Sequence, residues 1–314
     1  MFMTKPGTIA DHPDNIQLVH LSDPHLTSLH GIKWHELTNK RILGYLSWLT
    51  RRNRLHKISV LKALLEDLQA LKPDHIAITG DLTQIGTSME YREVRLWLDG
   101  LGPPERVTVI PGNHDRYVRA KWRETMHHWL PYLHDDADVD PSRLFPVLRC
   151  RGPVAIVGLS SATPTLPFMA TGRLGSTQLQ RLDKVLAELA NRDMFRVVLI
   201  HHGPLPGANS YRRRLMDRDD LISILKHRGA ELVLHGHGHQ NTEGVIRTMT
   251  TNIPVFGVAS ASVGSSRTIR NATYNLFSIS RQPGGWSIKL CFRNYNPYTG
   301  SFVTGVSRKL PFEV

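Results

Sequence analysis

Five apolar, β-branched runs of this chain are each followed by a short motif of metal-binding residue types. The runs have the length and composition of buried strands, and they are Ile16 to Leu21, His75 to Thr79, Val107 to Ile110, Val197 to Ile200 and Leu232 to Leu234. The motifs are Asp23-Pro24-His25, Gly80-Asp81, Gly112-Asn113-His114-Asp115, His201-His202 and the pair His237 and His239. Because residues that follow successive strands can converge on one rim of a sheet, the chain is restricted to folds in which this rim forms one site.

The motifs supply seven potential ligands, which suits a pair of divalent cations. Two cations roughly 3.5 to 4 Å apart need a bridging carboxylate, terminal imidazoles or amides, and open positions for water and a phosphate oxygen. Asp81 suits the bridge. The other ligands divide into Asp23, His25 and His239 for one cation, and Asn113, His201 and His237 for the other. Nitrogen and oxygen ligands without thiolate favour manganese or iron, with zinc as the alternative, over a soft metal such as Cu(I).

The ordered motifs Asp-x-His, Gly-Asp, Gly-Asn-His-Asp, His and Gly-His-x-His resemble those of the calcineurin-like metallophosphoesterase superfamily, over about residues 16 to 240. The run His201-His202-Gly203-Pro204 resembles the class III cyclic-nucleotide phosphodiesterases and their glycerophosphodiesterase relatives. The resemblance implies a dinuclear centre and hydrolysis at phosphorus by a metal-bound hydroxide. It also implies a four-layer α/β/β/α sandwich of two mixed sheets flanked by helices.

The resemblance places His114 beside the bound phosphate rather than on a cation. As an imidazolium, His114 would stabilise the charge of the transition state or protonate the leaving oxygen. Asp115 is expected to brace the turn after the strand. His202 is expected to orient the ligands without binding a cation itself. Since guanidinium groups bind phosphate oxygens bidentately, the candidates for substrate binding are Arg116, Arg212, Arg213 and His202.

Periodicity predicts the remaining elements of one domain over residues 16–314, after a flexible N-terminus at 1–15. Helices are predicted at Ile58 to Leu71, at Met89 to Leu98 and, capped by Ser176, at Thr177 to Leu189. A further strand is predicted at Val154 to Leu159. Four period-two strands are expected to form a second, mostly antiparallel sheet, and they are Val245 to Thr250, Val255 to Ala259, Tyr274 to Ser280 and Trp286 to Phe292.

A basic insertion at about residues 30–57 separates the first two motifs. Residues 33–57 contain one acid, Glu36, and seven bases, which are Lys33, Lys40, Arg41, Arg51, Arg52, Arg54 and Lys57. On a helical wheel one face collects the apolar side chains Ile42, Tyr45, Leu46 and Leu49. Such a helix suits an anionic membrane surface. The alternative is an ordinary helical cover over the domain, and in either case the insertion is expected to shape substrate access.

The insertion also resembles that of the chlamydial-type UDP-2,3-diacylglucosamine pyrophosphatases, through Asn39-Lys40-Arg41 and Arg51-Arg52. The more common diacylglucosamine pyrophosphatases carry arginine where this chain has His114. The leading hypothesis is therefore a phosphohydrolase that cleaves a phosphodiester or pyrophosphate bond in an amphiphilic nucleotide-lipid of this kind. The alternative is a soluble 3′,5′-cyclic nucleotide phosphodiesterase, and the minor alternatives are a nuclease and a non-catalytic scaffold.

Composition narrows the partners and the compartment. The formal net charge of +12 favours anionic partners, although no recognised nucleic-acid module accompanies the motifs. Two cysteines cannot build a disulfide framework. The first residues lack the apolar core of a secretory signal, and no run is long enough to span a bilayer. We expect a cytoplasmic protein, with peripheral attachment to the inner face of the membrane and a homodimer as further hypotheses.

Overall fold

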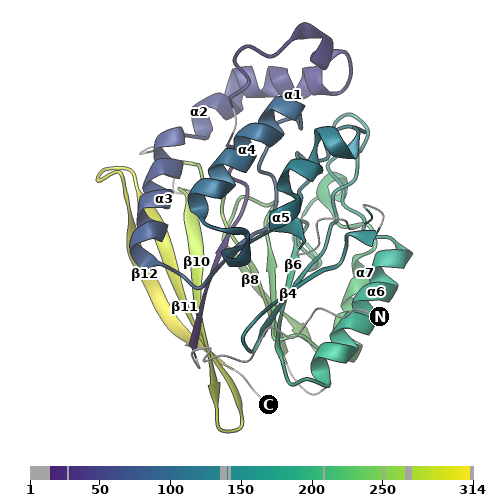
Figure 1. The fold of residues 1–314 in the computed structure, drawn as a ribbon, viewed down its shortest axis with the longest axis vertical. Helices are drawn as coiled ribbons and strands as arrows, with labels where there is room; N and C mark the ends of the chain where they lie inside the picture. Colours follow the sequence, from purple (N-terminus) through teal and green to yellow (C-terminus); the bar gives the residue numbers. More distant parts are fainter. Residues whose placement is uncertain are drawn as a thin grey trace.

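The computed structural model describes residues 15–26, 28–134, 140, 143–207, 209–249, 252–265 and 271–311. Two six-stranded sheets pack face to face, and helices cover their outer faces (Figure 1). The predicted sandwich of two mixed sheets flanked by helices is confirmed. The segment predicted as a flexible N-terminus lies outside the described residues, except for Asn15, which begins the first strand.

The first sheet has the order β12-β11-β10-β1-β2-β3. Its strands are β1 (Asn15–Leu21), β2 (His75–Ile78), β3 (Val107–Val109), β10 (Thr273–Gln282), β11 (Gly285–Asn296) and β12 (Ser301–Leu310). Strands β1, β2 and β3 are parallel, whereas β10 joins β1 in antiparallel pairing. The outer face packs against α3 (Ile58–Leu71), α4 (Ser88–Leu101) and α5 (Leu130–Leu133).

The second sheet has the order β4-β5-β6-β7-β9-β8. Its strands are β4 (Val147–Arg151), β5 (Val154–Gly158), β6 (Phe195–Ile200), β7 (Leu232–His235), β8 (Thr242–Arg247) and β9 (Asn252–Gly257). Strands β5, β6, β7 and β9 run parallel, and the two edge strands pair antiparallel. Its outer face packs against α6 (Ser176–Ala190) and α7 (Arg218–Arg228).

An apolar layer between the sheets holds them together. Side chains of the parallel strands are buried on both faces, as expected for strands covered by helices on one side and by a sheet on the other. Phe277 of β10 and Phe256 of β9 meet in this layer, with ring centroids 5.6 Å apart. The layer fixes the two sheets relative to each other, and so it fixes the relative positions of the loops at their rims.

The prediction of one antiparallel sheet after His239 is wrong. Strands β8 and β9 extend the second sheet beside β7, while β10, β11 and β12 extend the first sheet beside β1. Period-two alternation shows that a strand has one buried face, but it carries no information on which neighbour the strand pairs with. Strands β4 and β12 and helix α7 were not predicted. Ser176, the predicted cap, is the first residue of α6 and follows the N-cap Gly175.

The insertion is helical, and of the predicted apolar face only Tyr45 packs against the buried cluster of Leu29, Trp48 and Ile85. It contains the 3₁₀ turn η1 (Trp34–Leu37), α1 (Arg41–Ser47), the π-helical turn η2 (Trp48–Arg52) and α2 (Asn53–Leu55). Ile42, Leu46 and Leu49 are 40–49% exposed, whereas Gly44 and Trp48 are buried. The π turn disrupts the 3.6-residue periodicity on which the helical wheel depends, and the absent side chain of Gly44 lets α1 approach Ile85 and Tyr117.

Short 3₁₀ turns complete the described chain, and they are η3 (Pro104–Arg106), η4 (Trp122–Glu124), η5 (Met126–Trp129) and η7 (Tyr211–Arg213). Among the described residues, every helix is too short or too polar to cross a bilayer.

Candidate metal centre

The predicted ligands lie at the rim formed by the carboxyl ends of five parallel strands. Asp23 follows β1, Asp81 follows β2, Asn113 follows β3, His201 follows β6 and His237 follows β7. The rim therefore combines loops from both sheets. The layout agrees with the general rule that α/β sheets bind ligands beyond the carboxyl ends of their strands.

The backbone at this rim is held in a conformation that L-residues avoid. Asp23, His25, Asp81, His237 and His239 all have positive φ, from 40° to 65°. Eight described non-glycine residues have positive φ, so these five account for most of them. Such strain persists where the surrounding structure imposes it, and it clusters at functional sites. The geometry therefore points to the same residues as the motifs do, on independent grounds.

One ligand group contains Asp23, His25, Asp81 and His239, whose ligand atoms all lie within 4.8 Å of one another. The Nδ1–H of His25 donates to the Thr83 carbonyl at 3.1 Å, which leaves its Nε2 facing the group. That Nε2 lies 3.4 Å from Nε2 of His239, and His239 Nε2 lies 3.1 Å from an Asp23 carboxylate oxygen. Two imidazole nitrogens turned toward each other beside carboxylates fit a shared cation.

A second group forms around His201 and His237. The Nδ1–H of His201 donates to the Thr79 carbonyl at 2.6 Å, and its Nε2 lies 3.2 Å from the Asn113 amide oxygen. The Nε2 of His237 is buried and has no hydrogen-bond partner among the described residues. A buried imidazole nitrogen without a partner is costly, and a metal ion would satisfy it. The donor set therefore fits a second cation.

Asp81 connects the two groups. Its Oδ2 lies 3.4 Å from Nε2 of His201 and 3.9 Å from Nε2 of His25. Its Oδ1 accepts the backbone N–H of His114 at 2.7 Å. This is the position that a bridging carboxylate requires.

The protonation states also suit metal binding, because a metal ligand must be deprotonated. Burial lowers the pKa of His25 and His237 well below the ordinary value, so both rings are neutral. His201 differs. Burial opposes its protonation, but the adjacent Asp81 carboxylate outweighs burial and raises the pKa of His201 to about 9. The same closeness of His201 Nε2 and Asp81 Oδ2, 3.4 Å apart, would let both atoms face one cation.

Asp115 joins the loops after β2 and β3. Its carboxylate accepts backbone N–H groups of Asp81, Leu82, Thr83 and Gly112 at 2.8–2.9 Å. The same junction requires a glycine at position 112, where a Cβ atom would lie 2.7 Å from the ring of His201. Asp115 therefore braces the turn, as predicted, through hydrogen bonds that link the two loops.

His114 lies beside the first group without belonging to it. Its ring packs edge-on against His25, with centroids 4.8 Å apart. Its Nδ1 is engaged by the backbone carbonyl oxygen of Gln84 at 2.6 Å and by the Arg52 guanidinium at 3.0 Å, so Nε2 is the nitrogen left for a substrate. Burial, and to a lesser extent the nearby Arg52, lower the pKa of His114 to about 4, against the effect of Asp81. At neutral pH the ring of His114 is therefore neutral in this structure, in contrast to the predicted imidazolium, because burial disfavours the charged form.

The structure does not bring all of the candidate substrate residues to the rim. Arg116 is exposed and lines a separate hollow with Trp122 and Phe145. Arg212 is exposed on η7, whereas Arg213 donates to the backbone carbonyl of His237. His202 is buried beside His201 and His237, but its ring nitrogens contact Ser161 and Ala170, 2.7 and 3.2 Å away.

Sequence reasoning missed two residues that the insertion brings to the site. The guanidinium of Arg52 lies 3.0 Å from Nδ1 of His114 and donates to the Gln84 carbonyl at 3.2 Å. The ring of His56 lies 4.6 Å from that of His25, between centroids. Both residues belong to the basic run that suggested a membrane surface. No local signal distinguishes them from solvated charges, because their position depends on how the insertion folds back.

The model of the calcineurin-like phosphoesterase family matches residues 16–241. Similar curated proteins include a probable cyclic nucleotide phosphodiesterase of Synechococcus sp., 29% identical over 57% of this chain and 62% of the relative, so this chain spans less than two thirds of that protein. A cAMP/cGMP dual specificity phosphodiesterase of Mycobacterium tuberculosis is 28% identical over 81% of this chain and 70% of its own. A probable glycerophosphodiester phosphodiesterase of Arcobacter nitrofigilis is 25% identical over 79% of this chain and 88% of its own length.

Solved structures agree on the fold. A dimetal phosphatase from Danio rerio superposes with a TM-score of 0.62 at 11% identity, covering 92% of this chain and 98% of its own. A purple acid phosphatase from yellow lupin seeds has a TM-score of 0.58 at 12% identity, covering 95% of this chain and 54% of its own.

We predict that Asp81→Asn weakens both cation sites together. The substitution removes the negative charge between the two groups, and the loss of affinity should exceed about 100-fold, the upper end for losing a group that only supports a ligand. Metal content after dialysis, measured by mass spectrometry, checks this. Asp219→Asn is the matched control, because the Asp219 carboxylate is 85% exposed. Wild-type metal content in Asp81→Asn would contradict the bridging role.

Proposed function

Because this chain belongs to the calcineurin-like phosphoesterase family, we propose that it is a dinuclear metal-dependent phosphodiesterase acting on small phosphodiesters. 3′,5′-Cyclic nucleotides are the first candidate substrates, and glycerophosphodiesters the second. The observation that carries the proposal is the position of Asp81, whose Oδ2 lies within 4 Å of an imidazole from each ligand group. The names of the relatives support the diesterase alternative over the nucleotide-lipid pyrophosphatase.

In this proposal the first cation would be held by Asp23, His25 and His239, the second by Asn113, His201 and His237, and both by Asp81. Bound cations would activate water and neutralise phosphate charge. Backbone carbonyls of the protein supply the orientation. The Thr83 and Thr79 carbonyls fix the rings of His25 and His201, and the Gln84 carbonyl presents Nε2 of His114 to the substrate. A scaffold without activity would have no need to maintain this ligand geometry.

A substrate panel tests the proposal. The protein is loaded with Mn²⁺, Fe²⁺ or Zn²⁺ and assayed with cyclic AMP, cyclic GMP, glycerophosphodiesters, single-stranded DNA, a UDP-linked lipid and bis-p-nitrophenyl phosphate. We expect turnover of small diesters that is abolished by chelation. Cleavage of the UDP-linked lipid or of DNA, with none of the small diesters cleaved, would overturn the proposed substrate class.

We predict that His114→Ala keeps both cations and loses rate. Removing a general acid or an electrostatic contact typically costs about 10²- to 10⁴-fold, whereas the ligand atoms remain in place. Metal content and kcat on the best diester are measured together. The exposed His127 provides the control variant His127→Ala. Full rate in His114→Ala would remove His114 from the mechanism.

An amphiphilic substrate remains a second candidate because of one observation. Ile42, Leu46 and Leu49 expose an apolar stripe on the insertion, and Trp34 beside them along the chain is 80% exposed. Exposed apolar groups next to basic residues suit an anionic lipid surface. Against this, Arg41 and Arg52 turn inward and bind the backbone of residues 84–86, so part of the basic charge faces the site.

If the stripe binds lipid, Leu46→Gln should weaken binding to vesicles of phosphatidylglycerol and phosphatidylcholine by at least about tenfold, because burying a leucine side chain contributes about 1.5–3 kcal/mol. Co-sedimentation measures this. Leu96→Gln is the control, since Leu96 is 74% exposed on α4. Wild-type protein that stays in the supernatant would exclude the amphiphilic candidate.

A further inference from the structure

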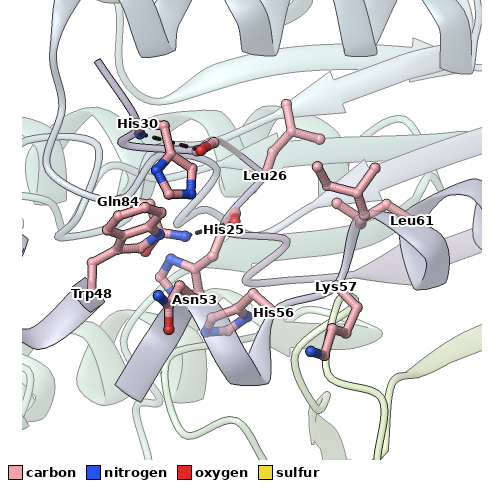
Figure 2. A pocket seen from close by; sticks show the side chains of 11 residues that line it. His25, Leu26, His30, Trp48, Asn53, His56, Lys57, Leu61 and Gln84 are labelled. Carbon is pink, nitrogen blue, oxygen red and sulfur yellow. Dashed lines mark hydrogen bonds between the residues drawn. The ribbon is translucent and has the colours of Figure 1, made fainter. Parts of the chain in front are cut away.

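A cavity of about 200 Å³ lies between the insertion and the domain (Figure 2). The insertion supplies Trp48, Asn53 and His56 to its wall, and the domain supplies His25, Leu26 and Gln84. His25 is the one candidate ligand in its wall, and no function has been assigned above to the cavity itself. Two kinds of side chain therefore line one space: apolar groups that exclude water and polar groups that can bind a ligand.

The cavity adjoins the first ligand group. His25 is common to both, and the ligand atoms of His25, His56 and His239 lie within 4.8 Å of one another. The Nδ1 of His56 pairs with the Ser262 hydroxyl at 2.7 Å, which holds the ring in place. A phosphoryl group bound at the first cation would therefore carry its ester substituent close to this cavity.

The wall of the cavity contains buried acceptors without donors. Gln84 is 1% exposed, and its Nε2 donates to the His25 carbonyl at 2.8 Å, which identifies its other amide atom as Oε1. This Oε1 and the amide oxygen of Asn53 are buried without hydrogen-bond partners in the described part of the chain. Buried acceptors are nearly always paired in folded proteins. A ligand that brings hydroxyl donors would pair them.

The cavity is preformed and small. The insertion is anchored to the domain on one side by Arg52, whose guanidinium donates to the backbone carbonyl of Gln84 at 3.2 Å. On the other side the backbone N–H of Lys57 donates to the Ser262 carbonyl at 2.8 Å. A volume of about 200 Å³ is below the roughly 300–1,000 Å³ of pockets for drug-sized ligands. It suits a compact group rather than an acyl chain.

We propose that this cavity binds the alcohol moiety of the substrate, a compact group with free hydroxyls that bond to the amides of Asn53 and Gln84. The ribose of a nucleotide and the glycerol of a glycerophosphodiester share this chemistry. The inference rests on the proposed function, because that function places the phosphorus beside the cavity. It extends the function by assigning substrate selection to the insertion.

The experiment pairs substrates that differ by hydroxyl groups. Cyclic AMP is compared with its 2′-deoxy analogue, and glycerophosphocholine with ethylphosphocholine, in the wild type, in Asn53→Leu and in the control Arg54→Gln, whose side chain is exposed. In the wild type and the control we expect kcat/KM to favour one hydroxylated substrate about tenfold, the equivalent of one net hydrogen bond. Asn53→Leu should abolish that preference, with metal content retained.

The pair that shows the preference identifies ribose or glycerol. Equal rates within both pairs in the wild type, or an unchanged preference in Asn53→Leu, would overturn the inference. If Asn53→Leu does not fold, Asn53→Ala replaces it, since it removes the same amide without adding bulk. If no diester is hydrolysed, the proposed function fails, and calorimetry on the Mn²⁺-loaded protein then decides the inference. Glycerol 3-phosphate or ribose 5-phosphate should bind more tightly than inorganic phosphate in the wild type but not in Asn53→Leu, and equal affinity would overturn it.

Discussion

The carboxylate of Asp115 is the contact on which the geometry of the site depends. By accepting backbone N–H groups from the loops after both β2 and β3, it holds Asp81 and Asn113 at a fixed separation. Burial and the nearby Asp81 charge raise the pKa of Asp115 to about 7, and the backbone donors oppose that rise by stabilising the ionised carboxylate. The same loop holds His114, whose backbone N–H donates to Asp81. One side chain outside the candidate ligand set thus positions Asp81, Asn113 and His114 together.

The insertion is the second segment that shapes the site, and it does so through close packing against the domain rather than through its charge. Gly44 and Trp48 bring it against the domain, and the π turn then directs Arg52 and His56 toward the rim. Its basic side chains divide: some stay in solvent, while Arg41 and Arg52 bond to backbone carbonyls of residues 84–86. A segment whose composition suggests a membrane surface therefore also lines a cavity beside the first ligand group. The exposed apolar stripe and the residues that line the cavity are separate surfaces of the insertion.

The gathering of the seven candidate ligands at one rim could be predicted because each lies within a few residues of the strand that positions it. The end of a strand can be located from the local sequence, and the type of each residue determines which metals its side chain can bind. The first strand, the helix at Ile58 to Leu71 and the strand from Val154 agree with the prediction to within one residue. The sheet to which each C-terminal strand belongs was predicted wrongly, because alternation shows which face of a strand is buried but not which strand lies beside it. Sheet membership is decided by contacts between residues more than two hundred positions apart, such as Val19 and Leu276.

The sequence by itself determined the set of candidate ligands, their order along the chain and which carboxylate is suited to bridging, since these follow from residue type and from position after a strand. Only the tertiary structure decided what surrounds those ligands. The left-handed backbone at Asp23 and His237, the partnerless amide oxygen of Gln84 and the position of His56 all arise from packing between distant segments. The reason is physical: a ligand type is a property of one residue, whereas a cavity is a property of the space left between many.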